Sequence, residues 1–280
     1  MSKVWLITGC SSGFGREIAL QALARGDTVV ATARSVSKLT HLSSLGATTL
    51  ALDVTSSDTE ISAVIASAIA KHGRIDILVN NAGVVLEGAI EEISDSEVKT
   101  NFNVNVFGTL AVTRAVLPYM RKEKKGVIAG MGSLGGWQGT PGCGVYCATK
   151  WALVGLFEAL KGEVKHLGIE VTLIEPGYFR TDLLAEGNKV IAKKVIEDFN
   201  PVMDPLRQSF EKYNHNQPGD PVKGSKLIVE ALTGTGRCEG RALPLRLGMG
   251  SDYVKIVEGI MEAAKKNLGD WKELSVSTDF

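Results

Sequence analysis

Three side chains in the middle of the chain have the types and the spacing of a proton-transfer site. Tyr146 and Lys150 are four positions apart at the start of a helical stretch, so they lie on one face of that helix. A tyrosine titrates near about 10, and a neighbouring ammonium group favours its phenolate form. Ser133 ends a β-branched run, and its hydroxyl can hold a substrate oxygen against Tyr146. These residues predict acid–base catalysis in which Tyr146 gives or takes the proton.

A glycine-rich segment near the N-terminus has the pattern of a dinucleotide-binding loop. It follows an apolar run directly and opens a helical stretch, and it reads Thr8-Gly9-Cys10-Ser11-Ser12-Gly13-Phe14-Gly15. Glycines allow a close approach of the backbone to a pyrophosphate, whose charge the N–H groups and dipole of a helix start stabilise. A second strand about 20 residues further on makes the pattern specific. The predicted cofactor contacts in this loop are Gly9, Ser11, Ser12, Gly13, Phe14 and Gly15.

The end of the second predicted strand indicates which dinucleotide is bound. An NAD site usually has an Asp or Glu there, which binds the ribose 2′-hydroxyl. This chain has Ala33 and Arg34 instead, and a guanidinium can pair with a 2′-phosphate through two hydrogen bonds. Ser12 can add a hydroxyl donor, and Asp53 is placed to accept a hydrogen bond from the adenine amine. The predicted cofactor is NADP(H), and the alternative interpretation of Arg34 is a solvated charge at a strand end.

The elements that position these residues follow from alternating β-branched runs and helical stretches. Such alternation is typical of parallel strands joined by crossover helices. It predicts an α/β fold with a doubly wound, parallel, seven-stranded, Rossmann-like sheet, helices on both faces, and one domain over residues 1–280. The predicted strands are Val4–Thr8, Thr28–Ala33, Thr48–Leu52, Ile75–Asn80, Gly126–Ser133, Ile169–Glu175 and Ala242–Leu247.

Two later segments do not follow this alternation. Apolar residues at helical spacing within 182–220 predict one or two amphipathic helices, which either cap the core or close over the substrate as a lid. Asn200-Pro201 and Asp204-Pro205 are expected to break this segment, and Pro218-Gly219 to end it. Residues 251–280 are expected to form a C-terminal helical extension.

Composition and charge argue against several other classes of protein. The 280 residues are 44% hydrophobic, with 31 basic and 31 acidic side chains, so nothing favours nucleic acid as a partner. No run of about 18 apolar residues predicts a membrane span, and Val4–Ile7 begin too early for a leader, so we expect a cytoplasmic protein. No metal site is expected, because no zinc ligand spacing is formed by Cys10, Cys143, Cys147 and Cys238.

These motifs resemble those of the classical short-chain dehydrogenase/reductase family over essentially the whole chain. The segment before Ser133, Ala129-Gly130-Met131-Gly132, departs from the family pattern, which commonly has a more apolar run and another serine. The Cys10-Ser11-Ser12 loop, Ala33-Arg34 and the extended C-terminus resemble retinol- and hydroxysteroid-dehydrogenase-like members and related ketoreductases. The matching segments are Thr8-Gly9-x-x-x-Gly13-x-Gly15, Asp53-Val54, Asn80-Asn81-Ala82-Gly83, Asn105, Ser133, Tyr146-x-x-x-Lys150 and Pro176-Gly177.

The resemblance implies a reaction and a role for each matching residue. The reaction is NADP(H)-dependent reduction of a ketone or aldehyde, or oxidation of the matching secondary alcohol. Lys150 would also hold the nicotinamide ribose, Ser133 would orient the substrate oxygen, and Asn105 would position a water in a proton relay to Lys150. Thr181 would bind the carboxamide. Further cofactor contacts are implied for Val54, Asn81, Ala82, Gly83, Pro176 and Gly177, of which Asn81, Ala82 and Gly83 would line the adenosine ribose.

Two other functions can be compared with this one on the sequence alone. A serine hydrolase needs a Gly-x-Ser-x-Gly elbow, but the residue two before Ser133 is Met131. A non-enzymatic dinucleotide sensor of the same fold keeps the glycine loop but has no need of Ser133, Tyr146 and Lys150 together. The isolated histidines, expected to be neither bases nor ligands, are His41, His72, His166 and His215.

The predicted substrate is a mostly apolar molecule of medium or large size. Leu134, Trp137 and Cys143 flank the catalytic residues, and the predicted lid is rich in aliphatic side chains and phenylalanine. Steroid, retinoid, polyketide and terpenoid carbonyls all fit this description, and fold alone does not choose among them.

Small residues along the helix after Tyr146 predict an association between copies of the chain. They recur every three or four positions and would let a second helix approach closely, or alternatively would pack on the chain's own sheet. The expected assembly is a homodimer or homotetramer. The residues are Ala148, Ala152, Gly155 and Ala159.

Overall fold

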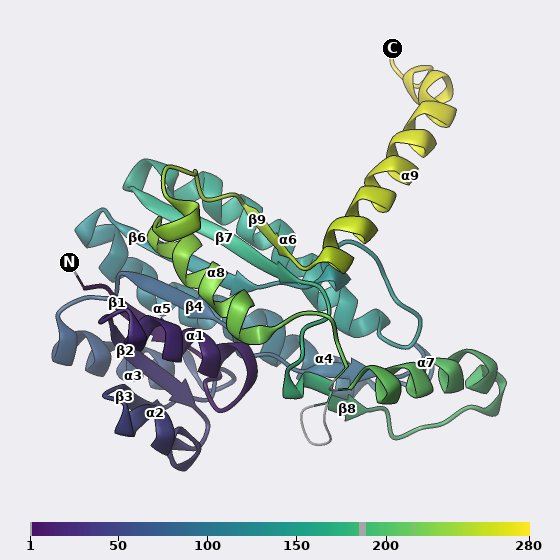
Figure 1. Cartoon of the computed structure of the whole chain (residues 1–280). Helices are drawn as coiled ribbons and strands as arrows, with labels where there is room; N and C mark the ends of the chain where they lie inside the picture. The colour runs from purple at the N-terminus through teal and green to yellow at the C-terminus, as the bar shows by residue number, and fades with distance from the viewer. Residues whose placement is uncertain (1, 185–188, 215) are drawn as a thin grey trace.

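The computed structural model describes residues 2–184, 189–214 and 216–280. Its centre is a parallel sheet with the strand order β3-β2-β1-β4-β6-β7-β9 (Figure 1). This order confirms the predicted doubly wound, seven-stranded fold. The strands are β1 (Val4–Ile7), β2 (Thr28–Ala33), β3 (Thr48–Ala51), β4 (Ile77–Asn80), β6 (Gly126–Met131), β7 (Ile169–Pro176) and β9 (Arg246–Met249).

Helices cover both faces of the sheet, and each face has its own hydrophobic core. Strand β1 reads Val-Trp-Leu-Ile and is buried at every position, as expected for a central strand with helices on both sides. One face is covered by α1 (Gly13–Ala24), α2 (Thr40–Ser44) and α8 (Pro221–Thr233). The other is covered by α3 (Asp58–His72), α5 (Gly108–Glu123) and α6 (Gly144–Val164).

Six of the seven predicted strands have different bounds in the structure: five differ by one or two residues at one end, and the last strand differs by more. Strand β6 ends at Met131, so Ser133 lies beyond the strand and begins a 3-10 turn at Leu134–Gly136. Strand β9 is Arg246–Met249 rather than Ala242–Leu247. Its register is set by parallel pairing with β7, from Leu173 opposite Arg246 to Pro176 opposite Met249. Residue type alone therefore placed this strand too early.

The segment between 182 and 220, predicted as one or two amphipathic helices, contains one helix and also a strand that was not predicted. Residues Lys189–Ile191 form strand β8, which pairs in parallel with β5 (Val85–Glu87) as a small second sheet. A single helix, α7 (Asn200–Tyr213), follows. The two prolines do not break it, because Pro201 occupies the first turn, where the missing N–H has no helical acceptor, and Pro205 is accommodated one turn later. Residues 185–188 of the predicted lid, and His215, lie outside the described residues.

Two further elements complete the chain. Helix α4 (Asp95–Phe102) continues through a π-helical turn at Asn103–Phe107 into α5. At the C-terminus, α9 (Ser251–Val276) projects away from the rest of the molecule (Figure 1). Among the described residues, no helix is both long enough and apolar enough to cross a membrane.

Candidate active site

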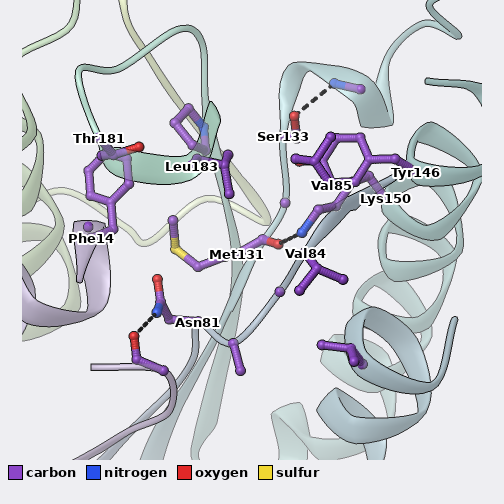
Figure 2. Close-up of a pocket in the computed structure, with 18 of the residues that line it drawn as sticks. Phe14, Asn81, Val84, Val85, Met131, Ser133, Tyr146, Lys150, Thr181 and Leu183 are labelled. Atoms are coloured by element: carbon purple, nitrogen blue, oxygen red, sulfur yellow. Dashed lines mark hydrogen bonds between the residues drawn. The ribbon is translucent and has the colours of Figure 1, made fainter. Parts of the chain in front are cut away.

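The carboxyl ends of the central strands open into a cavity of about 640 Å³ (Figure 2). In a doubly wound sheet the ligand site is expected at this edge, where the strand order reverses between β1 and β4. Gly15 and Asn105 are the two predicted site residues that do not line this cavity. Those that line it are Gly9, Ser11, Ser12, Gly13, Phe14, Arg34, Asp53, Val54, Asn81, Ala82, Gly83, Ser133, Tyr146, Lys150, Pro176, Gly177 and Thr181.

The glycine loop is fixed against the end of β4 and has no room for larger residues. Gly9 has a φ of +70°, and a Cβ there would lie 3.0 Å from the Ala82 Cα. A Cβ on Gly15 would lie 2.4 Å from the Gly9 carbonyl oxygen, so only glycine allows this close contact within the loop. The Asn81 side-chain amide donates to the carbonyls of Thr8 and Gly9 at 2.9 and 3.1 Å. The loop backbone is therefore preorganised at the start of α1.

Three of the four predicted catalytic side chains, Ser133, Tyr146 and Lys150, lie on one wall of the cavity (Figure 2). Lys150 Nζ lies 5.5 Å from the centre of the Tyr146 ring and donates a hydrogen bond of 2.7 Å to the Met131 carbonyl oxygen. Ser133 Oγ accepts from the Gly135 backbone N–H at 3.1 Å. That bond leaves the Ser133 hydroxyl proton available for Tyr146 or for a substrate oxygen between the two side chains.

Burial governs the protonation of this pair. It raises the pKa of Tyr146, and the Ser133 hydroxyl offsets part of the effect. Burial also lowers the pKa of Lys150 to about 8. Desolvation disfavours the charged form of either group, and here it outweighs the lowering of the Tyr146 pKa that the sequence predicted from the ammonium alone. The resting site therefore holds a protonated tyrosine, which is the form of a general acid.

Asn105 stands behind the catalytic residues and is almost fully buried. Its side-chain oxygen accepts from the Val84 N–H at 2.9 Å, and its amide donates to the Val84 carbonyl and to Thr149 Oγ1, each at 3.0 Å. A Cβ on Gly83 would lie 3.3 Å from the Asn105 oxygen and 3.8 Å from Lys150 Nζ. Asn105 thus links the chain beyond β4 to α6 beside the lysine.

The far end of the cavity contains the residues expected to meet the adenosine half of a dinucleotide. Arg34 is exposed at the end of β2 and lines the cavity. Asp53 Oδ1 accepts from the Thr55 N–H at 2.9 Å and from its hydroxyl at 2.7 Å. The described residues give Asp53 Oδ2 no hydrogen bond, so it is available to a bound ligand.

Comparison with known proteins agrees with this geometry. The family model described as short chain dehydrogenase matches residues 3–191. The chain belongs to this family. It is 36% identical over 282 residues to oxidoreductase BOA17 of Botryotinia fuckeliana, an alignment that covers 99% of this chain and 100% of that protein. A crystal structure of a short-chain dehydrogenase from Streptomyces avermitilis is 40% identical, with a TM-score of 0.90 and coverage of 100% of both chains.

The family fold binds a nicotinamide dinucleotide. ElxO, solved with NADP, is 25% identical, with a TM-score of 0.73 and coverage of 91% of this chain and 100% of that one. Another solved short-chain dehydrogenase of this fold holds NAD. This dehydrogenase is thus an oxidoreductase by family, and its own cavity residues must indicate which dinucleotide it prefers.

The unusual segment before Ser133 is explained by packing. A Cβ on Gly130 would lie 2.4 Å from the Phe157 ring, and one on Gly132 would lie 2.9 Å from the Leu173 side chain. Larger residues are therefore excluded by α6 on one side and β7 on the other. The glycines therefore let α6 and β7 pack closely against the strand end.

A buried polar cluster supports the wall of the cavity and was not found from the sequence. The Glu175 carboxylate accepts from Trp137 Nε1 and from the Tyr253 hydroxyl, each at 2.8 Å, and pairs with Arg246 at 2.7 Å. Arg246 also lies 3.7 Å over the Trp137 ring. Of the three apolar residues that flank the catalytic side chains in the sequence, Leu134 and Cys143 line the cavity and Trp137 does not. The sequence signal that could have indicated this cluster is an acidic residue inside a β-branched run, Glu175, with a basic residue, Arg246, in a later run.

Two cysteines, Cys143 and Cys147, line the cavity. Cys10, Cys143 and Cys147 are buried free thiols, whereas Cys238 is only partly buried. Burial raises the pKa of Cys143 to about 12, so its thiol stays protonated. Among the described residues, no three His, Cys, Asp or Glu side chains are grouped as a metal site.

Proposed function

We propose that this protein is an NADP(H)-dependent ketoreductase or alcohol dehydrogenase acting on a mostly apolar substrate of medium or large size. The observation that carries the proposal is the convergence of Ser133, Tyr146 and Lys150 on one wall of a cavity whose other end is a glycine loop. The bound dinucleotide supplies or accepts a hydride at the substrate carbon.

The residues of the chain supply the proton and hold the reacting oxygen. Ser133 donates a hydrogen bond to the carbonyl oxygen, and Tyr146 gives that oxygen its proton as the carbon is reduced. In the reverse direction Tyr146 takes the proton from the alcohol. Lys150, held by the Met131 carbonyl, is positioned to bind the nicotinamide ribose and to favour the tyrosinate as the proton leaves. Asn105 donates a hydrogen bond to Thr149, the residue before Lys150, and is proposed to complete the proton relay.

The preference for NADP(H) rests on Arg34 and Ala33. Arg34 is exposed at the cavity end, where a 2′-phosphate would lie, and Ala33 brings no carboxylate to repel it. The remaining contacts to the dinucleotide are assigned to the glycine loop, to Asp53, and to Thr181, which lies beside Gly13.

The nature of the substrate follows from the side chains around Tyr146. Val85, Leu134, Leu183, Phe210 and Ile256 line the cavity. They come from the chain after β4, the turn after β6, the lid segment and α9. Apolar groups from four separate elements fit a bulky hydrophobic carbonyl compound better than a small polar one.

The test of the function is Tyr146→Phe. The variant keeps the ring and its packing but lacks the proton, so ketone reduction should fall by about 10²–10⁴-fold while NADPH binding stays near wild type. Single-turnover hydride transfer and NADPH affinity are measured together on a panel of hydrophobic ketones. A variant that keeps more than about a tenth of the wild-type rate refutes the assignment. A protein that binds NADPH but reduces no ketone in either form would be a sensor.

A further inference from the structure

Helix α9 packs on the rest of the chain only at its base. Tyr253 and Val257 are buried with Leu134 in a small core beside the cavity. Every residue from 261 to 280 is exposed, and the helix stands clear of the molecule (Figure 1). The free part, 261–276, is about 24 Å long. Helices of this length are marginal in water unless an apolar face is covered.

The free part has such an apolar face. Val257, which is buried at the base, belongs to a row of apolar residues that continues up the helix at alternating spacings of three and four residues, the heptad pattern of a coiled-coil seam. Met261, Leu268 and Trp271 on this stripe are 58%, 69% and 60% exposed. The whole stripe consists of Val254, Val257, Met261, Ala264, Leu268 and Trp271.

The opposite face argues for a protein partner over a lipid surface. A helix that lies on an anionic membrane is usually rich in Lys and Arg on its polar face. Here acidic and basic residues alternate there, and Lys266 pairs with Asp270 one turn on. The charged residues of this face are Lys255, Glu262, Lys266, Asp270 and Glu273.

The charges beside the stripe are self-complementary. Glu258 and Lys265 lie one heptad apart on the same edge of the seam. Two copies of α9 packed antiparallel, with the midpoint between Met261 and Ala264, bring Glu258 of each copy beside Lys265 of the other. The pairing occurs twice, once on each side of the two-fold axis.

The apolar residues fit the same arrangement. Antiparallel packing at this midpoint sets Met261 opposite Ala264, so that a large side chain faces a small one, and it brings the exposed Leu268 and Trp271 to the base of the other helix, beside the Val257 core and the exposed Val254. Parallel packing would place Ala264 against Ala264, which leaves a gap, and Trp271 against Trp271. It would also leave Glu258 without a facing lysine.

We propose that α9 is an association helix that pairs antiparallel with α9 of a second copy of this chain. This contact is separate from the small-residue stripe on α6, where Gly155 is exposed with nothing within 4 Å of its Cβ position. A protein that uses both surfaces has two different two-fold contacts, which close as a tetramer. A protein that uses α9 alone is a dimer.

The experiment is a charge swap in the full-length protein, followed by light scattering on a sizing column at micromolar concentration. Glu258→Lys puts like charges together twice and should halve the mass of the assembly. The double variant Glu258→Lys with Lys265→Glu should restore the wild-type mass. Glu262→Lys, the same change on the opposite face of the helix, is the matched control and should leave the mass unchanged. Leu268→Asp places a charge in the apolar seam and should also halve the mass of the assembly.

The proposal is wrong if the wild-type protein is a monomer, or if neither Glu258→Lys nor Leu268→Asp changes the mass. A double variant that stays dissociated overturns the antiparallel pairing. Co-sedimentation with phosphatidylcholine–phosphatidylserine vesicles is the second arm, and binding that Leu268→Asp abolishes would assign the stripe to a membrane instead. Circular dichroism and NADPH binding confirm that each variant is folded.

Discussion

Replacing Lys150 by Met is expected to stabilise the protein at neutral pH while removing its activity. Lys150 is 5% exposed, and burial lowers its pKa from 10.5 to about 8. One pKa unit corresponds to about 1.4 kcal/mol, so the charged lysine costs the folded state about 3 kcal/mol at pH 7. The hydrogen bond to the Met131 carbonyl, lost in the variant, offsets about 1–2 kcal/mol of this gain. We expect a net stabilisation of about 1–2 kcal/mol.

The pH dependence gives a sharper test than the stability itself. Between pH 8 and 10.5 the folded protein binds fewer protons at Lys150 than the unfolded chain does, so wild-type stability rises with pH in that window. The methionine variant lacks this rise. The difference in free energy of unfolding between the variant and wild type should therefore shrink by about 2 kcal/mol between pH 7.5 and pH 10. Tyrosines titrate in both proteins, so their contribution cancels in the difference between the two free energies of unfolding.

The assay is equilibrium unfolding in urea at both pH values, with Lys161→Met as the control. Lys161 lies on the same helix, is partly exposed, and donates to the Leu243 carbonyl at 3.3 Å, so its variant loses a similar bond without the relief of a buried charge. If Lys150→Met is less stable than wild type by the same amount at pH 7.5 and at pH 10, the desolvation argument fails. The argument also fails if Lys150→Met and Lys161→Met change the free energy of unfolding at neutral pH by the same amount.

Three further changes test other parts of the site. Arg34→Asp should reverse the cofactor preference, because a carboxylate repels the 2′-phosphate and accepts from a 2′-hydroxyl; unchanged ratios of kcat/KM for NADPH and NADH would show that Arg34 is only a solvated charge. Glu87→Gln should raise KM for the substrate more than it lowers kcat, because buried Glu87 holds the lid segment through Arg207 at 3.2 Å; steady-state kinetics with an intact KM would show that the lid does not depend on this ion pair. Glu175→Ala should lower the free energy of unfolding by about 3–5 kcal/mol, because it leaves Arg246 unpaired beside the cavity; urea unfolding within about 1 kcal/mol of wild type would contradict this.

The sequence by itself predicted the parallel sheet, which the structure confirms, and the residues that gather at its carboxyl edge. Most strands are continuous runs of β-branched residues. Turn-forming glycines and prolines and the starts of helices are likewise encoded by residues close together in the sequence. For the same reason the glycine loop, Tyr146 and Lys150 were found directly, since each belongs to one turn or one helix. The prediction for Arg34 also rests on a local feature, its place at the end of a strand.

Contacts between distant segments were decided only by the tertiary structure. Strand β8 forms because Lys189–Ile191 lies along β5, about a hundred residues earlier, and no local pattern encodes that pairing. Trp137 lies outside the cavity because its indole N–H donates to both the Glu175 carboxylate and the Tyr253 hydroxyl. The protonation of Tyr146 follows likewise from burial by several elements at once, and desolvation depends on everything packed around a group rather than on its neighbours in sequence.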